Sequence, residues 1–118
     1  MIKIADVITL KNNQGKEHIY FVIGKHGDRF LIVNATSFKP NKDSSCMLNS
    51  TDHPFIRKKT IVNYGDALTA KETIIEKNIS LGISRRLPPI KGKVLERIIE
   101  GALKSDAFPG KYRVYVMK

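Results

Sequence analysis

The apolar residues of this chain fall into short runs separated by polar segments, and this pattern predicts a mainly β protein. Two of the runs, Ile19–Ile23 and Phe30–Val33, flank the segment Gly24–Asp28, whose two glycines permit the positive φ angles of a tight turn. We therefore predict a β-hairpin here. Because both arms are apolar at successive positions, we expect each arm to be buried on both faces, in the middle of a sheet or small barrel.

Further runs rich in β-branched and aromatic residues predict the other strands. In chain order these are Ile4–Leu10, a small edge strand at Cys46–Leu48, Thr60–Tyr64 with an extension over Ala67–Ala70, and an alternating last strand at Tyr112–Val116. Polar residues, glycine and proline predict a loop at Lys11–Glu17 and an exposed excursion at Phe38–Asp52. In the segment after this excursion, we expect Phe55 and Ile56 to anchor the chain on the core.

The clearest helical pattern runs from Lys91 to Lys104. Its apolar residues recur at helical spacing, and these are Val94, Leu95, Ile98, Ile99, Ala102 and Leu103. A shorter helix is predicted over Lys71–Lys77, with Asn78 or Gly82 ending it. Together the elements predict a mainly β (α+β) fold, a small curved antiparallel barrel whose open side is covered by the C-terminal amphipathic helix and which closes with a final strand.

Composition limits the number of domains and the location of the protein. With 118 residues, 42% of them hydrophobic, the chain can build one compact core, so we predict a single domain over residues 1–118. The one cysteine, Cys46, excludes an internal disulfide and a cysteine-cluster metal site. No apolar segment is long enough for a signal peptide or a membrane span, so we expect a cytoplasmic protein without membrane association.

The charge balance points to an acidic partner. The chain has 21 lysines and arginines against 11 aspartates and glutamates, which gives a formal net charge of +10. A positive field of this size favours a polyanion such as nucleic acid, or an acidic protein. The best candidates for phosphate contacts are the run Arg57, Lys58 and Lys59 and the pair Arg85 and Arg86, although such runs are most often only solvated surface charge.

Polar residues collect where the two arms of the predicted hairpin begin and end. His18 opens the first arm, and Thr36 and Ser37 close the second. Because the arms are antiparallel, both ends lie at the same edge of the hairpin, so we expect His18 and Thr36 to converge on one site, with Lys16 nearby. The alternative interpretation is structural: an exposed histidine at a strand entrance, and hydroxyls that terminate a strand by bonding to the backbone.

The order of these elements resembles the MazF/PemK-like toxins over most of the chain. Asp6-Val7-Ile8 resembles the opening Gly-Asp-Val/Ile strand of that family, with Ala5 in place of the glycine. His18–Gly24 resembles the Arg-Pro pair and the hydrophobic strand after it, and Leu31–Ser37 resembles a strand that ends in Pro-x-Thr-Ser. The closing glycine and helix of the family are similar to Gly82 and, after Pro88-Pro89, to the helical spacing of Leu95, Ile98 and Leu103. The run Asp52–Ile56 resembles a divergent branch of these barrels.

This resemblance implies an SH3-like barrel that acts as a metal-independent endoribonuclease on single-stranded RNA, without a cofactor. It also implies an acidic antitoxin as a protein partner and a homodimer. By position, Thr36 matches the family's threonine and His18 stands at its catalytic arginine. A histidine titrates close to neutral pH and can serve as general base or acid, while the hydroxyls of Thr36 and Ser37, with Lys16, can hold the phosphate.

Several residues carry weaker hypotheses. His53 is either a contact to RNA or a loop residue packed by the proline that follows it, and Tyr20, Phe30 and Phe38 are candidates for stacking on unpaired bases, with Phe30 better suited to the core. The three histidines lack metal-ligand spacing, so we predict no bound metal.

Two other functions fit the same pattern. The first is a non-catalytic barrel of the same shape that binds nucleic acid or a partner protein, and the replacement of the family arginine by His18 favours it. The second is a gyrase-poisoning toxin of CcdB type. It ranks last because that family's binding end is a tryptophan-containing C-terminal helix, whereas this chain has no tryptophan.

Overall fold

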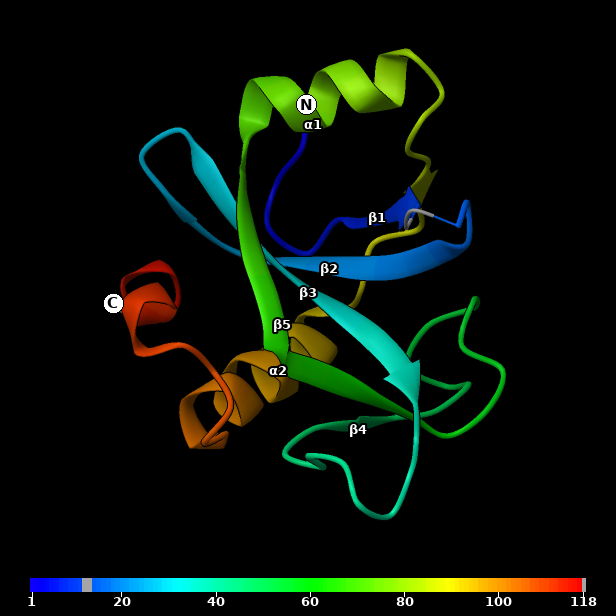
Figure 1. Ribbon diagram of the computed structural model, residues 1–118, viewed down its shortest axis with the longest axis vertical. Helices are drawn as coiled ribbons and strands as arrows, with labels where there is room; N and C mark the ends of the chain where they lie inside the picture. Colours follow the sequence, from blue (N-terminus) through cyan, green and yellow to red (C-terminus); the bar gives the residue numbers. More distant parts are fainter. Residues whose placement is uncertain (12–13, 118) are drawn as a thin grey trace.

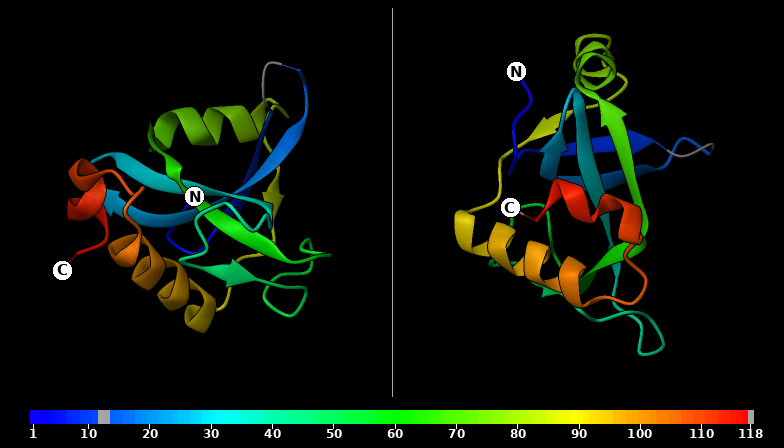
Figure 2. Two further views of the ribbon diagram at one scale, coloured as in Figure 1. Left: turned by 60° about the horizontal axis from the view of Figure 1, so that its bottom comes forward. Right: turned by 90° about the vertical axis from the view of Figure 1, so that its left-hand side faces the viewer.

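A computed structural model describes residues 1–11 and 14–117 of the chain (Figure 1). In chain order its elements are β1 (Val7–Lys11), β2 (Glu17–His26), β3 (Arg29–Ser37), β4 (Met47–Leu48), β5 (Thr60–Lys71), α1 (Glu72–Ser80), β6 (Arg86–Leu87), α2 (Gly92–Lys104) and the 3-10 helix η1 (Gly110–Tyr115). The strands form one antiparallel sheet in the order β4-β5-β3-β2-β1-β6. The sheet is strongly curled (Figure 2), which confirms the predicted fold class.

The predicted hairpin is formed by β2 and β3, and both strands are longer than the apolar runs that signalled them. Their pairing ends with His26 opposite Arg29, and Gly27 in the turn has a φ of +61°. The sequence had suggested that Gly24 belongs to the turn, but the structure places it elsewhere. It lies in β2 at a bulge, where a side chain would collide with the backbone carbonyl of Tyr115, so its role is to permit close packing of η1.

The sheet is covered on both faces, as the unbroken apolar arms of the hairpin predicted. On one face Phe21 packs in a cluster that includes Ile98 of α2, and on the other Val22 packs in a cluster that includes Ile75 of α1. Figure 2 shows α1 and α2 on opposite sides of the curled sheet. Burial of each such side chain contributes roughly 1.5–3 kcal/mol, so these two clusters supply most of the hydrophobic stabilisation.

Strand β5 joins two predicted segments into one long, bent strand. The register of its pairing with β3 shifts between Ile32 and Asn34, and within the bend Asn63 Nδ2 donates a hydrogen bond to Asp66 Oδ2 (2.9 Å). The predicted edge strand is present as β4, and the predicted short helix as α1. Gly82, with a φ of +76°, follows this helix as expected.

The two ends of the chain differ from the prediction. The first strand begins at Val7 rather than Ile4, because Ala5 has a φ of +84°, which interrupts extended backbone. The predicted last strand is wrong: residues 110–115 form η1. The i, i+3 spacing of this helix brings the rings of Tyr112 and Tyr115 together, with centroids 6.1 Å apart, and both rings pack against the core. The pattern that predicted an alternating strand therefore belongs to a 3-10 helix.

Helix α2 forms over almost the predicted range and buries the face that the sequence indicated. Tyr64 Oη donates a hydrogen bond of 2.7 Å to the carbonyl of Ile98, next to Gly101, where a side chain would collide with the Tyr64 hydroxyl. In the described residues, the helices are too short and too polar to cross a lipid bilayer. The predicted loop before β2 includes Asn12 and Asn13, which lie outside the described residues; Gly15 in the same loop has a φ of +78°.

Candidate functional site

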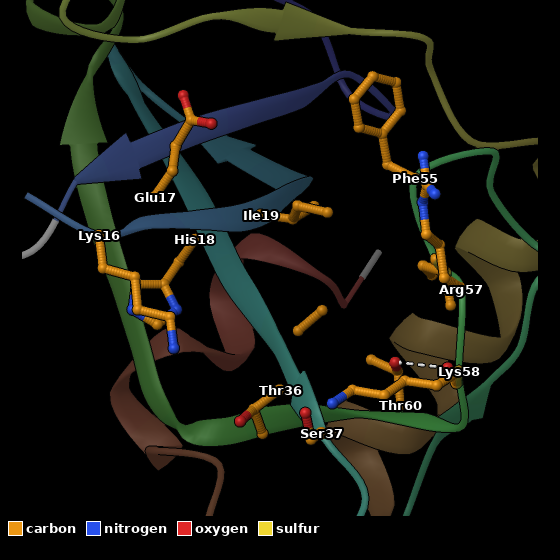
Figure 3. Close-up of a pocket in the computed structure, with 12 residues that line it drawn as sticks. Lys16, Glu17, His18, Ile19, Thr36, Ser37, Phe55, Arg57, Lys58 and Thr60 are labelled. Atoms are coloured by element: carbon orange, nitrogen blue, oxygen red, sulfur yellow. Dashed lines mark hydrogen bonds between the residues drawn. The ribbon is translucent and has the colours of Figure 1, made fainter.

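A pocket opens where the two strands of the hairpin separate. The last paired residues of β2 and β3 are Tyr20 and Asn34, and beyond them the two strands diverge (Figure 3). The pocket between them has a volume of about 370 Å³. It is lined by the start of β2 with the residue before it, by the end of β3 and by the segment that leads into β5, with the residues Lys16, Glu17, His18, Ile19, Ala35, Thr36, Ser37, Phe55, Ile56, Arg57, Lys58 and Thr60.

The structure brings six of the predicted site residues to this one pocket. These are Lys16, His18, Thr36, Ser37, Arg57 and Lys58. Because side chains alternate along a strand, His18 and Thr36 lie on one face of the diverging strands, while Ile19 and Ser37 lie on the other (Figure 3). An imidazole and a hydroxyl therefore share one side of the opening, and a second hydroxyl faces the loop that carries the cations.

The loop on the far side of the pocket is held in place by His53, which is only 2% exposed. Its Nδ1 accepts a hydrogen bond from the backbone N–H of Phe55 (3.1 Å), so Nε2 carries the proton and donates to the carbonyl of Pro88 (2.6 Å). The backbone N–H of Ile56 also donates to the His53 carbonyl. Both ring nitrogens of His53 are thus engaged inside the protein, as the alternative of a packed loop residue expected.

A second contact fixes the same loop to α2. Arg97 Nη1 donates to Asp52 Oδ1 at 2.8 Å, and Arg97 Nη2 donates to the carbonyl of Met47 at 2.6 Å. The loop thus has a side-chain anchor at each of two consecutive residues, Asp52 and His53. Such anchors reduce the conformational entropy that the loop would lose on binding a ligand.

Phe55 is the pocket residue that sequence reasoning misjudged. Only Ile56 anchors the loop on the core (4% exposed), whereas Phe55 is 45% exposed at the pocket. The aromatic residues proposed for stacking lie elsewhere: Phe30 is in the core, and Phe38 lies under the ammonium of Lys59, which is 4.4 Å from the ring centroid. In extended backbone, adjacent side chains point in opposite directions, so Phe55 and Ile56 should not both have been assigned to the core.

Tyr20 lies on the same face of β2 as His18, but it does not line the pocket. It packs against the cluster under α1 and is half-buried. Burial, with the nearby carboxylate of Asp66, raises the pKa of its hydroxyl. Tyr20 therefore does not provide a stacking surface inside the pocket.

The described lining of the pocket holds three cations and one carboxylate, and the carboxylate is also neutralised from outside. Glu17 accepts two hydrogen bonds from Arg85, at 2.6 and 3.0 Å, and these lower the pKa of Glu17 to about 2. Arg57 and Lys58, by contrast, have no carboxylate within ion-pair distance in the part of the chain that the structure describes. Figure 3 shows Lys58 extending across the pocket toward Ser37.

Three predicted phosphate contacts do not reach this pocket. Arg85 is engaged by Glu17, and Arg86 donates to Asp6 Oδ2 (2.8 Å) and to the carbonyl of Met1. Lys59 covers the ring of Phe38. These cations serve contacts within the fold, and the structure separates them from the open cations of the pocket.

The pocket thus combines an imidazole, hydroxyls, cations and a small apolar surface, which suits a phosphate ester carrying an apolar group. Within residues 1–11 and 14–117, no three His, Cys, Asp or Glu side chains are grouped so that they could hold a metal ion. Neither a protein-family model, nor a curated protein, nor a solved structure matches this chain.

Proposed function

We propose that this chain is a MazF/PemK-like toxin that cleaves single-stranded RNA at the pocket without a metal ion. The observation that carries the proposal is that His18, Thr36 and Ser37 line the same pocket as Arg57 and Lys58. A base, hydroxyl donors and cations are the groups that cleavage of RNA by its own 2′-hydroxyl requires.

The backbone near the chain's start supports the same resemblance. Ala5 has a φ of +84° at the position where the family has glycine. Glycine adopts this conformation without a steric cost, whereas alanine pays roughly 1–2 kcal/mol. Ala5 thus has the backbone conformation that glycine favours, at the position where the proposed family has glycine.

The proposed reaction is a transesterification. His18 removes the proton of the 2′-hydroxyl, the 2′ oxygen bonds to phosphorus, and the bond from phosphorus to the 5′ oxygen breaks. The departing 5′ oxygen takes a proton from water, and His18 returns its proton to the hydroxide so formed. The products are a 2′,3′-cyclic phosphate and a 5′-hydroxyl, while Thr36, Ser37 and Lys58 stabilise the charge on the phosphate oxygens.

The proposal includes two protein partners. An acidic antitoxin would bind where RNA binds, since the same uncompensated cations attract either polyanion. A second copy of the chain would form the homodimer that the resemblance implies. Both partners follow from the proposed family.

The test is incubation of the purified protein with a labelled single-stranded RNA in EDTA. We expect fragments that end in a 2′,3′-cyclic phosphate, and His18→Ala should slow their formation at least about 100-fold, the typical contribution of a general base. The matched control is His26→Ala, because His26 is an exposed histidine at the hairpin turn and does not line the pocket. No fragments from the wild-type protein, or equal rates for wild type and His18→Ala, would contradict the proposal.

A second function, a barrel that binds RNA without cleaving it, is favoured by one observation. Among the described residues that line the pocket, His18 is the one histidine, and the carboxylate beside it is ion-paired with Arg85, so the pocket offers a single side chain suited to general acid or base catalysis. Salt-sensitive retention of intact RNA, with no fragments after long incubation, would select this function.

A further inference from the structure

Phe55 is an exposed aromatic ring that the proposed chemistry does not use. It lies at the pocket with 45% of its surface exposed, while its neighbour Ile56 is buried. A phenylalanine exposed to this extent gains only part of the free energy that full burial would provide. Its position beside the pocket makes it a candidate for contact with a ligand.

The ring is held out by the backbone that carries it. The N–H of Phe55 donates to the buried His53 ring, whose centroid lies 5.9 Å from the Phe55 ring, and the next residue is anchored in the core. Two hydrogen bonds of His53 and the contact of Asp52 with Arg97 fix the loop just before Phe55. A ring presented by a fixed backbone loses little entropy on binding.

Opposite this loop the pocket presents an apolar surface. Figure 3 shows Ile19 of β2 pointing across the pocket toward the loop from which Phe55 and Arg57 extend. Ala35 of β3 also lines the pocket, and Ile56 completes the apolar lining. An apolar slot therefore lies directly next to the cations Arg57 and Lys58.

We propose that Phe55 and Ile19 form a slot for one unpaired base of a single-stranded nucleic acid, whose adjacent phosphates contact Arg57 and Lys58. The proposal rests on the proposed function and assigns the subsite next to the reacting phosphate. A flat ring beside uncompensated cations suits a base and its phosphate, because every base has a π-face and every nucleotide a negative charge. An acidic peptide would satisfy the cations but leave the aromatic ring without a planar partner.

The slot should hold any base. Among the hydroxyls that line the pocket, Thr60 Oγ1 already donates to the carbonyl of Lys58 (2.8 Å). Among the described lining residues on the face of Ile19, Ser37 carries the remaining hydroxyl, and one hydroxyl is too little to read a base edge. Stacking without edge recognition is tolerant of sequence.

The experiment measures binding of a 2′-O-methyl oligonucleotide by fluorescence anisotropy, since the blocked 2′ oxygen cannot attack the phosphate. Phe55→Ala should weaken binding between about 5- and 150-fold, the range expected for loss of one stacked base, and Phe55→Trp should retain it. An abasic nucleotide moved along the oligonucleotide should reproduce this loss at one position. Phe55→Ala combined with that abasic position should lose no more than either change alone.

The control variant is Leu81→Ala, which removes a more exposed apolar side chain (61%) after α1, outside the pocket. It should leave binding unchanged, and equal thermal midpoints would show that both variants are folded. Two results would overturn the slot while leaving the proposed function intact. The first is unchanged binding by Phe55→Ala, and the second is a loss from Phe55→Ala that adds to the loss from an abasic nucleotide at every position tested. Absence of binding by the wild-type protein would overturn both.

Discussion

Two groups of cations looked equivalent in the sequence and differ in the structure. Arg85 and Arg86 are ion-paired, with Glu17 at 2.6 Å and Asp6 at 2.8 Å. Arg57 and Lys58 line the open end of the hairpin, and among residues 1–11 and 14–117 no carboxylate pairs with them. The difference teaches that a cation becomes available to a phosphate through the absence of a neighbouring carboxylate, not through its place in a basic run.

Of the ion-paired cations, Arg86 has a structural role that a single substitution can test. The Asp6 side chain is 6% exposed, and its Oδ2 accepts hydrogen bonds from Arg86 and from the backbone N–H of Lys3. Arg86→Ala leaves this buried carboxylate without its cation. We expect the free energy of unfolding to fall by about 1–3 kcal/mol, measured by urea denaturation, because a charged group loses a hydrogen-bond partner.

The sharpest control for Arg86→Ala is Arg57→Ala. We expect Arg57→Ala to change the free energy of unfolding by less than about 0.5 kcal/mol, as for other surface substitutions. Equal destabilisation by the two variants would break the distinction between paired and open cations.

The pair of Glu17 and Arg85 should give a smaller effect with a defined pH range. Arg85 lowers the pKa of Glu17 from 4.5 to about 2, so the pair stabilises the fold above pH 4.5 and this contribution disappears as the pH falls toward 2. Arg85→Ala should return the pKa of Glu17 toward its ordinary value, seen by NMR titration of the carboxyl carbon. Because the pair is exposed to solvent, the loss of stability at neutral pH should be smaller than that caused by Arg86→Ala.

The control for this titration is Lys93→Ala, which removes an exposed cation from α2. It should leave the pKa of Glu17 low. A Glu17 carboxyl that titrates near 4.5 in the wild-type protein would show that the pair does not form in solution.

Local patterns in the sequence predicted most of the fold. The apolar runs on either side of Gly27 gave the hairpin and its burial on both faces, and the spacing of Val94, Ile98 and Ala102 gave α2. These patterns are set by nearby residues, because the periods of strands and helices are local properties. The end of the chain was misread because alternating tyrosines suit a strand and also the three-residue period of η1.

The site was predicted in part for the same reason. Antiparallel pairing is enough to bring His18 and Thr36 to one edge, and the structure places both at the pocket. The partners of Arg85 and Arg86 are 68 and 80 residues away in sequence, so no local pattern could reveal them. The exposure of Phe55 likewise depends on the contact of His53 with Pro88, 35 residues away.

The most direct test of the account is the salt dependence of RNA binding when the two open cations are removed. A variant with Arg57→Ala and Lys58→Ala should bind single-stranded RNA about 10- to 50-fold more weakly in 0.1 M salt. Its logarithmic salt slope should be smaller by about 1.4, or 0.7 for each lost phosphate contact. The control loses the same charge through Lys77→Ala and Lys93→Ala on α1 and α2. An unchanged slope in the control is the expected result, and equal changes in both variants would contradict a binding site at the open end of the hairpin.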